Sequence, residues 1–133
     1  MNEKTSRHIL VVDDDDGARN LICRVLNQRG FAVLAAASGA AAIQQLSTHG
    51  PAVALTVLDM TMPEMDGEHT FAALHKLQPD LRFLLFTGVC DDPALQRLLA
   101  TGLCAHLNKP CSLVMLVEKV QGLLAQTPPP TAP

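Results

Sequence analysis

Two apolar patterns alternate along nearly the whole chain, and together they restrict the folds open to it. Short runs of consecutive apolar residues, such as residues 9–12, are followed by segments in which apolar residues recur every three or four positions. A continuous apolar run suits a strand buried on both faces, and the longer spacing suits one face of a helix. Strands buried on both faces belong in parallel sheets with helices on each side, so the pattern predicts an α/β fold.

Five strand–helix units account for this alternation, at about 25 residues each, which is the length that one such unit needs with short loops. The strands are predicted over residues 9–12, 32–35, 53–58, 83–86 and 104–107. The first helix is predicted to carry on one face Ala18, Leu21, Ile22, Val25 and Leu26. A chain of 133 residues is therefore predicted to form one three-layer, doubly wound domain around a five-stranded parallel sheet.

Residues with capping or helix-breaking preferences mark the ends of the predicted helices. Ser38 and Ser112 precede apolar helical patterns and are expected to act as N-caps. Asp92, which is followed by proline, has the same predicted role ahead of the fourth helix. Gly30 and Gly102 are expected to end the first and fourth helices.

Composition and chain ends exclude several classes of protein. The net charge of −3 and the absence of Trp and Tyr disfavour direct binding of nucleic acid. No apolar run approaches the roughly 18 residues of a membrane span. Four cysteines without a C-x-x-C pair favour reduced thiols and a cytoplasmic location. The compact domain is expected over residues 8–125, between a polar lead, 1–7, without the apolar core of a signal peptide, and a proline-rich tail, 126–133.

Polar side chains follow four of the predicted strands at the point where each strand ends. Asp13 and Asp14 follow the first strand, Asp59 the third, Thr87 the fourth and Lys109 the fifth. The carboxyl ends of parallel strands meet at one edge of the sheet, where ligands bind in folds of this type. Clustered carboxylates repel one another unless a hard divalent cation such as Mg²⁺ neutralises them. Carboxylates, a metal ion, a lysine and a hydroxyl around one point predict a phosphoryl-transfer site.

In these stretches the sequence resembles the receiver domains of two-component response regulators. The matching motifs are residues 9–15 (ILVVDDD), 58–67 (LDMTMPEMDG), 86–88 (FTG) and 108–110 (NKP). They occur in the family's order, and the resemblance extends both to chemotaxis regulators and to C-terminal receivers of hybrid sensor histidine kinases. It implies a flavodoxin-like parallel sheet of strand order 2-1-3-4-5. It also implies a phosphorylated signalling protein that catalyses only phosphoryl transfer onto and off its own aspartate.

The resemblance implies that Asp59 is the phosphoryl acceptor. The donor would be a phosphohistidine on a sensor histidine kinase or on a histidine phosphotransfer protein. Asp14 would ligate Mg²⁺ or Mn²⁺ directly, and Asp13 would act close by, partly through water. The backbone carbonyl of Thr61 and the Asp59 carboxylate would complete the protein ligands of the metal.

Two further roles follow from the resemblance, and one position departs from it. Thr87 would turn toward the bound phosphoryl group as a switch, and Lys109 would pair with that group, aimed inward by a cis Lys109–Pro110 bond. The family usually has Tyr or Phe three positions before the lysine, whereas this chain has His106. Histidine is smaller and titrates near neutral pH. His106 is therefore either a switch residue or a half-buried residue at the sheet edge with no such role.

Particular residues argue against three rival functions. A haloacid-dehalogenase-type phosphatase needs a second acid two residues after its nucleophile, where this chain has Thr61. A calcium-binding loop would place Val12 at its first position, where an acid is required. A flavin site needs a Ser/Thr- and Gly-rich phosphate loop that does not follow the first strand. A phosphorylation-independent binding module and a receiver from a hybrid histidine kinase both stay open, as do the downstream partner and the pairing of two copies.

Overall fold

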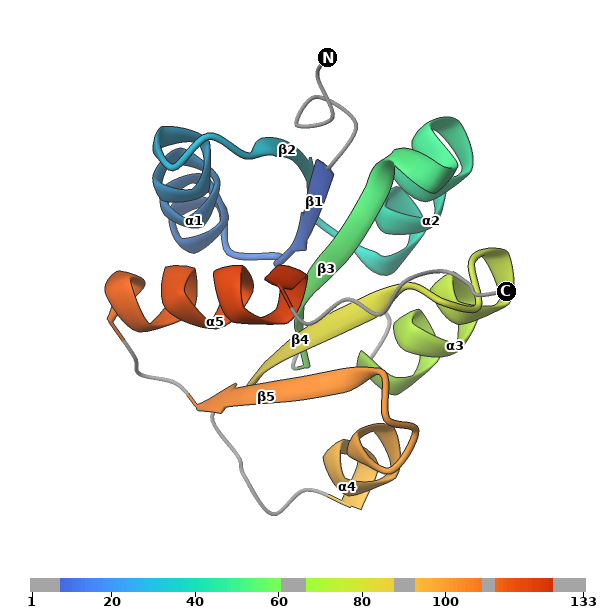
Figure 1. The fold of residues 1–133 in the computed structure, drawn as a ribbon. Helices are drawn as coiled ribbons and strands as arrows, with labels where there is room; N and C mark the ends of the chain where they lie inside the picture. The colour runs from blue at the N-terminus through green and yellow to red at the C-terminus, as the bar shows by residue number, and fades with distance from the viewer. Residues whose placement is uncertain (1–7, 61–66, 88–92, 109–111, 126–133) are drawn as a thin grey trace.

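A parallel sheet forms the centre of the molecule (Figure 1). The computed structural model describes residues 8–60, 67–87, 93–108 and 112–125. Within them five strands pair in the order β2-β1-β3-β4-β5, and every neighbouring pair is parallel. The strands are β1 (His8–Val12), β2 (Ala32–Ala36), β3 (Val53–Asp59), β4 (Arg82–Thr87) and β5 (Cys104–Asn108). The predicted strand order is confirmed, and the predicted lead and tail lie outside the described residues.

Helices cover both faces of the sheet and give the predicted three layers (Figure 1). They are α1 (Asp16–Gln28), α2 (Gly39–His49), α3 (Gly67–Leu77), α4 (Pro93–Leu99) and α5 (Leu113–Ala125). The helices α1 and α5 pack on one face, and α2, α3 and α4 pack on the other. Within the described part of the chain, no helix combines the length and apolarity that crossing a bilayer requires.

The central strand β1 is buried on both faces, because its successive side chains point to opposite sides of the sheet. Leu10 and Val12 belong to the core cluster under α2, α3 and α4, whereas Ile9 and Val11 belong to the cluster under α1 and α5. All four side chains are at most 1% exposed. A strand packed on both sides has little freedom to shift, so the residues at its carboxyl end are held by the two cores together.

The observed caps agree with the helix ends predicted from sequence where those ends are described. Ser38 Oγ accepts a hydrogen bond of 3.1 Å from the backbone N–H of Ala41, and Ser112 Oγ accepts one of 3.1 Å from that of Met115. Gly102, after α4, has a φ of 81°, a backbone conformation that glycine adopts without strain. The predicted cap Asp92 lies outside the described residues.

Leu21 departs from the predicted buried face of α1. Its side chain is 46% exposed, whereas Ile22 and Leu26 are buried. Neighbouring helical residues differ by about 100° around the axis, so Leu21 lies at the margin of the apolar stripe, away from the side centred on Ile22 and Leu26. The prediction that Leu21 faces the core is therefore wrong.

Gly67 begins α3 and lets this helix pack closely against the end of β3. A Cβ atom at this position would lie 2.9 Å from Cα of Met60 and would also collide with the Met60 side chain. Met60 is itself tied to the neighbouring strand, since its backbone N–H donates a 3.1 Å hydrogen bond to the carbonyl of Phe86. A side chain on residue 67 would thus push on the residue that directly follows Asp59.

We expect Gly67→Ala to lower the free energy of unfolding by about 1–3 kcal/mol, the usual cost of overpacking. Gly122→Ala is the matched control, because Gly122 lies within α5 and an added Cβ meets nothing within 4 Å. The control should raise the free energy of unfolding by about 1 kcal/mol through helix propensity alone. Urea unfolding monitored by circular dichroism measures both, and equal effects of the two substitutions would contradict the packing argument.

Candidate functional site

The ends of β1 and β3 bring three carboxylates together. One side-chain oxygen from each of Asp13, Asp14 and Asp59 lies within 4.8 Å of the others. Asp13 and Asp59 are 2% and 3% exposed, and Asp14 is open to solvent. The two strands are neighbours in the sheet, with Val12 opposite Leu58. The structure therefore confirms the prediction that the side chains of Asp13, Asp14 and Asp59 lie close together.

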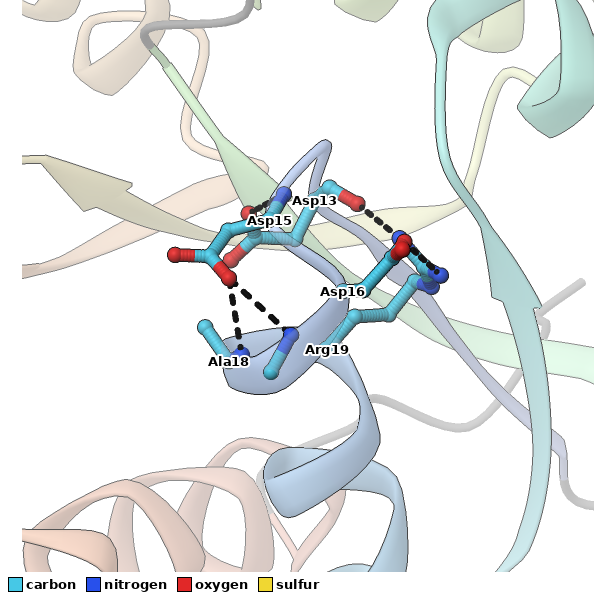
Figure 2. Close-up of polar contacts among 6 residues, drawn as sticks. Asp13, Asp15, Asp16, Ala18 and Arg19 are labelled. Carbon is cyan, nitrogen blue, oxygen red and sulfur yellow. Dashed lines mark hydrogen bonds and ion pairs between the residues drawn. The ribbon is translucent and has the colours of Figure 1, made fainter.

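Backbone hydrogen bonds hold Asp13 and the turn that follows it (Figure 2). The Asp13 N–H donates a 3.1 Å hydrogen bond to the carbonyl of Ala36 in β2. Its Oδ1 accepts a 2.9 Å hydrogen bond from the N–H of Asp15. Asp15 in turn caps α1, because its Oδ1 accepts hydrogen bonds from the N–H groups of Gly17, at 3.0 Å, and Ala18, at 3.3 Å. The cluster thus lies beside a helix N-terminus, whose partial positive charge favours carboxylates.

The donor set of this cluster fits a hard divalent cation. Mg²⁺ prefers oxygen ligands at about 2.0–2.1 Å in an octahedron, which separates the ligand atoms by about 3–4 Å. The observed spread of up to 4.8 Å is close to that separation. One exposed and two buried carboxylates match a magnesium ion that retains several waters, and Mn²⁺ prefers the same oxygen ligands.

The ends of β4 and β5 lie along the same edge of the sheet. Thr87, the last residue of β4, is opposite Asn108, the last residue of β5, and Phe86 is opposite Asp59. Residue 87 is thereby one register step beyond Asp59, the last residue of β3. Two predicted members of the site, Lys109 and Thr61, lie outside the described residues.

His106 lies on β5, on the face of the sheet that carries α4. Cys104, two residues earlier and hence on the same side, packs against the cluster that contains Leu95 and Leu98 of α4. The His106 side chain is half-buried, and its Nε2 atom is buried without a hydrogen-bond partner in the described part of the chain. A buried polar atom without a partner is unfavourable, so a rotation that hydrates or bonds Nε2 would lower the energy of this residue.

Sequence reasoning missed the capping role of Asp15. The sequence predicts Asp13 and Asp14 as metal ligands and gives Asp15 no role of its own, whereas the Asp15 side chain caps the backbone of α1. The signal was present, because an aspartate directly before a helical apolar pattern is a common N-cap.

One family profile and several known proteins match most of this chain. The family profile described as the response regulator receiver domain matches residues 9–121. The sensor kinase CckA of Brucella abortus is 36% identical over 119 residues, which cover 90% of this chain and 13% of that protein. Sporulation initiation phosphotransferase F of Bacillus subtilis is 30% identical over 124 residues, which cover 93% of this chain and 95% of that protein.

Solved structures agree with the sequence comparison. A CheY-like response regulator receiver domain protein from Methanospirillum hungatei has a TM-score of 0.83 at 26% identity, covering 91% of this chain and 95% of that one. Among the sequence relatives, the chain matches a small part of the Brucella sensor kinase and nearly the whole of the Bacillus phosphotransferase.

Millimolar Mg²⁺ is expected to raise the melting temperature, because a cation that binds only the folded cluster stabilises it and offsets carboxylate repulsion. Asp14→Asn should remove most of this increase. Asp80→Asn is the matched control, since it removes the same charge from an exposed residue just before β4, at the opposite end of the strands. Differential scanning calorimetry with Mg²⁺ and with EDTA measures the shift. No shift in the wild type, or the same shift in Asp14→Asn, would exclude a cation at this cluster.

Proposed function

The chain belongs to the response regulator receiver domain family of two-component signalling, and we propose that it accepts a phosphoryl group on Asp59 from a phosphohistidine. The observation that carries the proposal is the burial of Asp59 at the end of β3, with carboxylate oxygens of Asp13 and Asp14 within 4.8 Å. The donor is a sensor histidine kinase or a histidine phosphotransfer protein.

In the proposed reaction a carboxylate oxygen of Asp59 attacks phosphorus. The P–N bond to the donor imidazole breaks as the P–O bond to Asp59 forms, and the imidazole leaves with the electron pair. Asp59 needs no general base, because the attacking group is already a carboxylate. Mg²⁺, held by Asp13, Asp14, Asp59 and the carbonyl of Thr61, would supply positive charge to the phosphoryl oxygens.

Thr87 and Lys109 complete the proposed site from the two remaining strands. Lys109 directly follows β5 and would pair with the phosphoryl oxygens as a fixed cation. Thr87 ends β4 and would donate its hydroxyl hydrogen to the same group. The register of β4 on β3 and of β5 on β4 supports both roles, since it aligns residues 59, 87 and 108 along one edge. The chain's chemistry is limited to its own aspartate.

Phosphorylation is proposed to change a protein-contact surface that includes β5 and α4. A new anion at Asp59 would pull Thr87 and the segment that leads to α4, and His106 faces the same helix. His106, with its unpartnered Nε2, is proposed as the second switch residue. The outcome is a changed affinity for a downstream protein or for a second copy of the chain. We place this reaction in the cytoplasm, where Cys23 and Cys104 remain free thiols.

One of two further candidates has specific support. The 36% identity to the Brucella sensor kinase favours a receiver that works as part of a hybrid histidine kinase. A phosphorylation-independent binding module is the second, and it requires that the acidic cluster have lost its chemistry.

Incubation with acetyl phosphate and Mg²⁺ should add one phosphoryl group to the protein, as measured by intact mass. The adduct should be absent in Asp59→Ala and in EDTA, because the acceptor or the neutralising cation is then missing. A folded wild type that gains no adduct, from acetyl phosphate or from a phosphorylated histidine phosphotransfer domain, would favour the binding module. An adduct that persists in Asp59→Ala would assign the acceptor to another residue.

His106→Ala is expected to leave the extent of phosphorylation nearly unchanged and to weaken its effect on α4. Amide hydrogen exchange of residues 94–99, with and without acetyl phosphate, measures that effect. His69→Ala, which removes an exposed histidine of α3, is the control and should behave as the wild type. Loss of phosphorylation in His106→Ala would place this histidine in the chemistry, and an unchanged response of α4 would exclude it from the switch.

A further inference from the structure

Arg19 spans the acidic turn that connects β1 to α1. Its Nη1 donates a 2.9 Å hydrogen bond to the backbone carbonyl of Asp13, and its Nη2 contacts Oδ1 of Asp16 at 2.6 Å (Figure 2). Asp14 and Asp15 lie between these two acceptors in the chain. One guanidinium therefore bridges the start and the end of the turn that carries two of the three clustered carboxylates.

The Arg19 side chain is held in place more firmly than an ordinary surface arginine. It is 14% exposed, although its partner Asp16 is 81% exposed. A side chain already confined by packing loses little additional rotamer freedom when it makes hydrogen bonds. The planar guanidinium also presents its donors in a fixed fork, which suits two acceptors at set positions. The contact to Asp13 is thus an organised part of the turn.

Arg19 donates to the backbone carbonyl of Asp13, so this hydrogen bond does not occupy the Asp13 carboxylate. With its N–H bonded to Ala36 in β2 and its carbonyl bonded to Arg19, residue 13 has its main chain held on both sides. The direction of its side chain, and the path of the chain into Asp14, follow from that backbone. Arg19 therefore acts on the geometry of the carboxylates without neutralising them.

The positive charge of Arg19 and its hydrogen bonds to the turn are expected to affect metal binding in opposite directions. As a nearby cation, Arg19 repels a second cation, so charge alone would make its removal tighten the binding of Mg²⁺. As a group that orients ligands, it strengthens metal binding, by about 10- to 100-fold for outer contacts of this kind. The Asp16 carboxylate, 2.6 Å away, offsets the charge of Arg19, so the effect of position is the larger one.

We propose that Arg19 is a positioning residue of the Asp13–Asp14–Asp59 cluster, holding the 13–16 turn so that its carboxylates converge on a divalent cation. The proposal rests on the proposed function in one respect, because the cation is the Mg²⁺ of that site. Lysine cannot replace Arg19, since a single ammonium group cannot bridge both acceptors with the geometry of the fork.

The test is the Mg²⁺ affinity of Arg19→Gln and Arg19→Lys, measured by isothermal titration calorimetry on the full chain. Both variants should bind Mg²⁺ about tenfold more weakly than the wild type. The matched control is Arg24→Gln, which removes the same charge from an exposed position on α1 and should bind as tightly as the wild type. Asp16→Asn weakens the same bridge from its acceptor side and should weaken binding without altering Arg19.

Amide hydrogen exchange in EDTA provides a second readout that needs no metal. The N–H groups of Asp15, Gly17 and Ala18 should exchange faster in both Arg19 variants, because the hydrogen bonds that protect them depend on the turn. The N–H of Val120 in the core of α5 should be unchanged, which separates loosening of the turn from global destabilisation.

The outcomes distinguish this proposal from the proposed function. Binding by Arg19→Gln as tight as in the wild type, or tighter, overturns the positioning role and leaves the proposed function intact. Full recovery in Arg19→Lys also overturns it, since charge would then suffice. Absence of Mg²⁺ binding by the wild type itself overturns the proposed metal site and this proposal together.

Discussion

Three carboxylates meet where two strands with little exposed surface come to an end, and much of the surrounding structure keeps them there. Two of them, Asp13 and Asp59, are almost wholly buried. Like charges held this close repel one another, so the cluster favours a bound cation. The arrangement persists because packing on both faces of β1 and β3 stabilises the strands that carry these residues. The core thus offsets a local electrostatic cost at the place where the proposed phosphoryl transfer needs a cation.

The residues around the carboxylate cluster fix the position of its backbone and contribute less to its charge. Asp15 and Arg19 fix the turn after β1 through hydrogen bonds to main-chain groups. Gly67 lets α3 approach the residue after Asp59, and Met60 is tied to β4 by its own N–H. Each of these contacts restricts where a carboxylate can lie and leaves its oxygens available. The proposed binding of a cation and a phosphoryl group requires such a rigid frame around the ligands.

The parallel sheet and the aspartate cluster could be predicted from features that are local in the sequence, whereas the strand order was implied only by the resemblance to receiver domains. Asp13 and Asp59 directly follow apolar runs, and parallel topology brings such residues to one edge. The role of Arg19 could not be predicted in this way, since its spacing from Asp16 fits an ordinary ion pair on a helix surface. Its bond to the Asp13 carbonyl depends on the path of the intervening turn. The exposure of Leu21 likewise depends on tertiary packing, because the buried side of α1 is centred on Ile22 and Leu26 and leaves Leu21 at its margin.

An ion pair between α3 and α4 makes a small contribution to the position of α4. Arg97 of α4 forms two hydrogen bonds of 2.7 Å with Glu68, in the first turn of α3. The pair is partly exposed, so it stabilises the fold by about 1 kcal/mol at most. That energy adds to the burial of Leu95 and Leu98, which holds this seven-residue helix on the core, and it is small beside the free energy of the charge-assisted bonds that the proposed phosphorylation would form. Since Glu68 lies directly after Gly67, the orientation of α4 is linked through this ion pair to the same segment that packs against the end of β3.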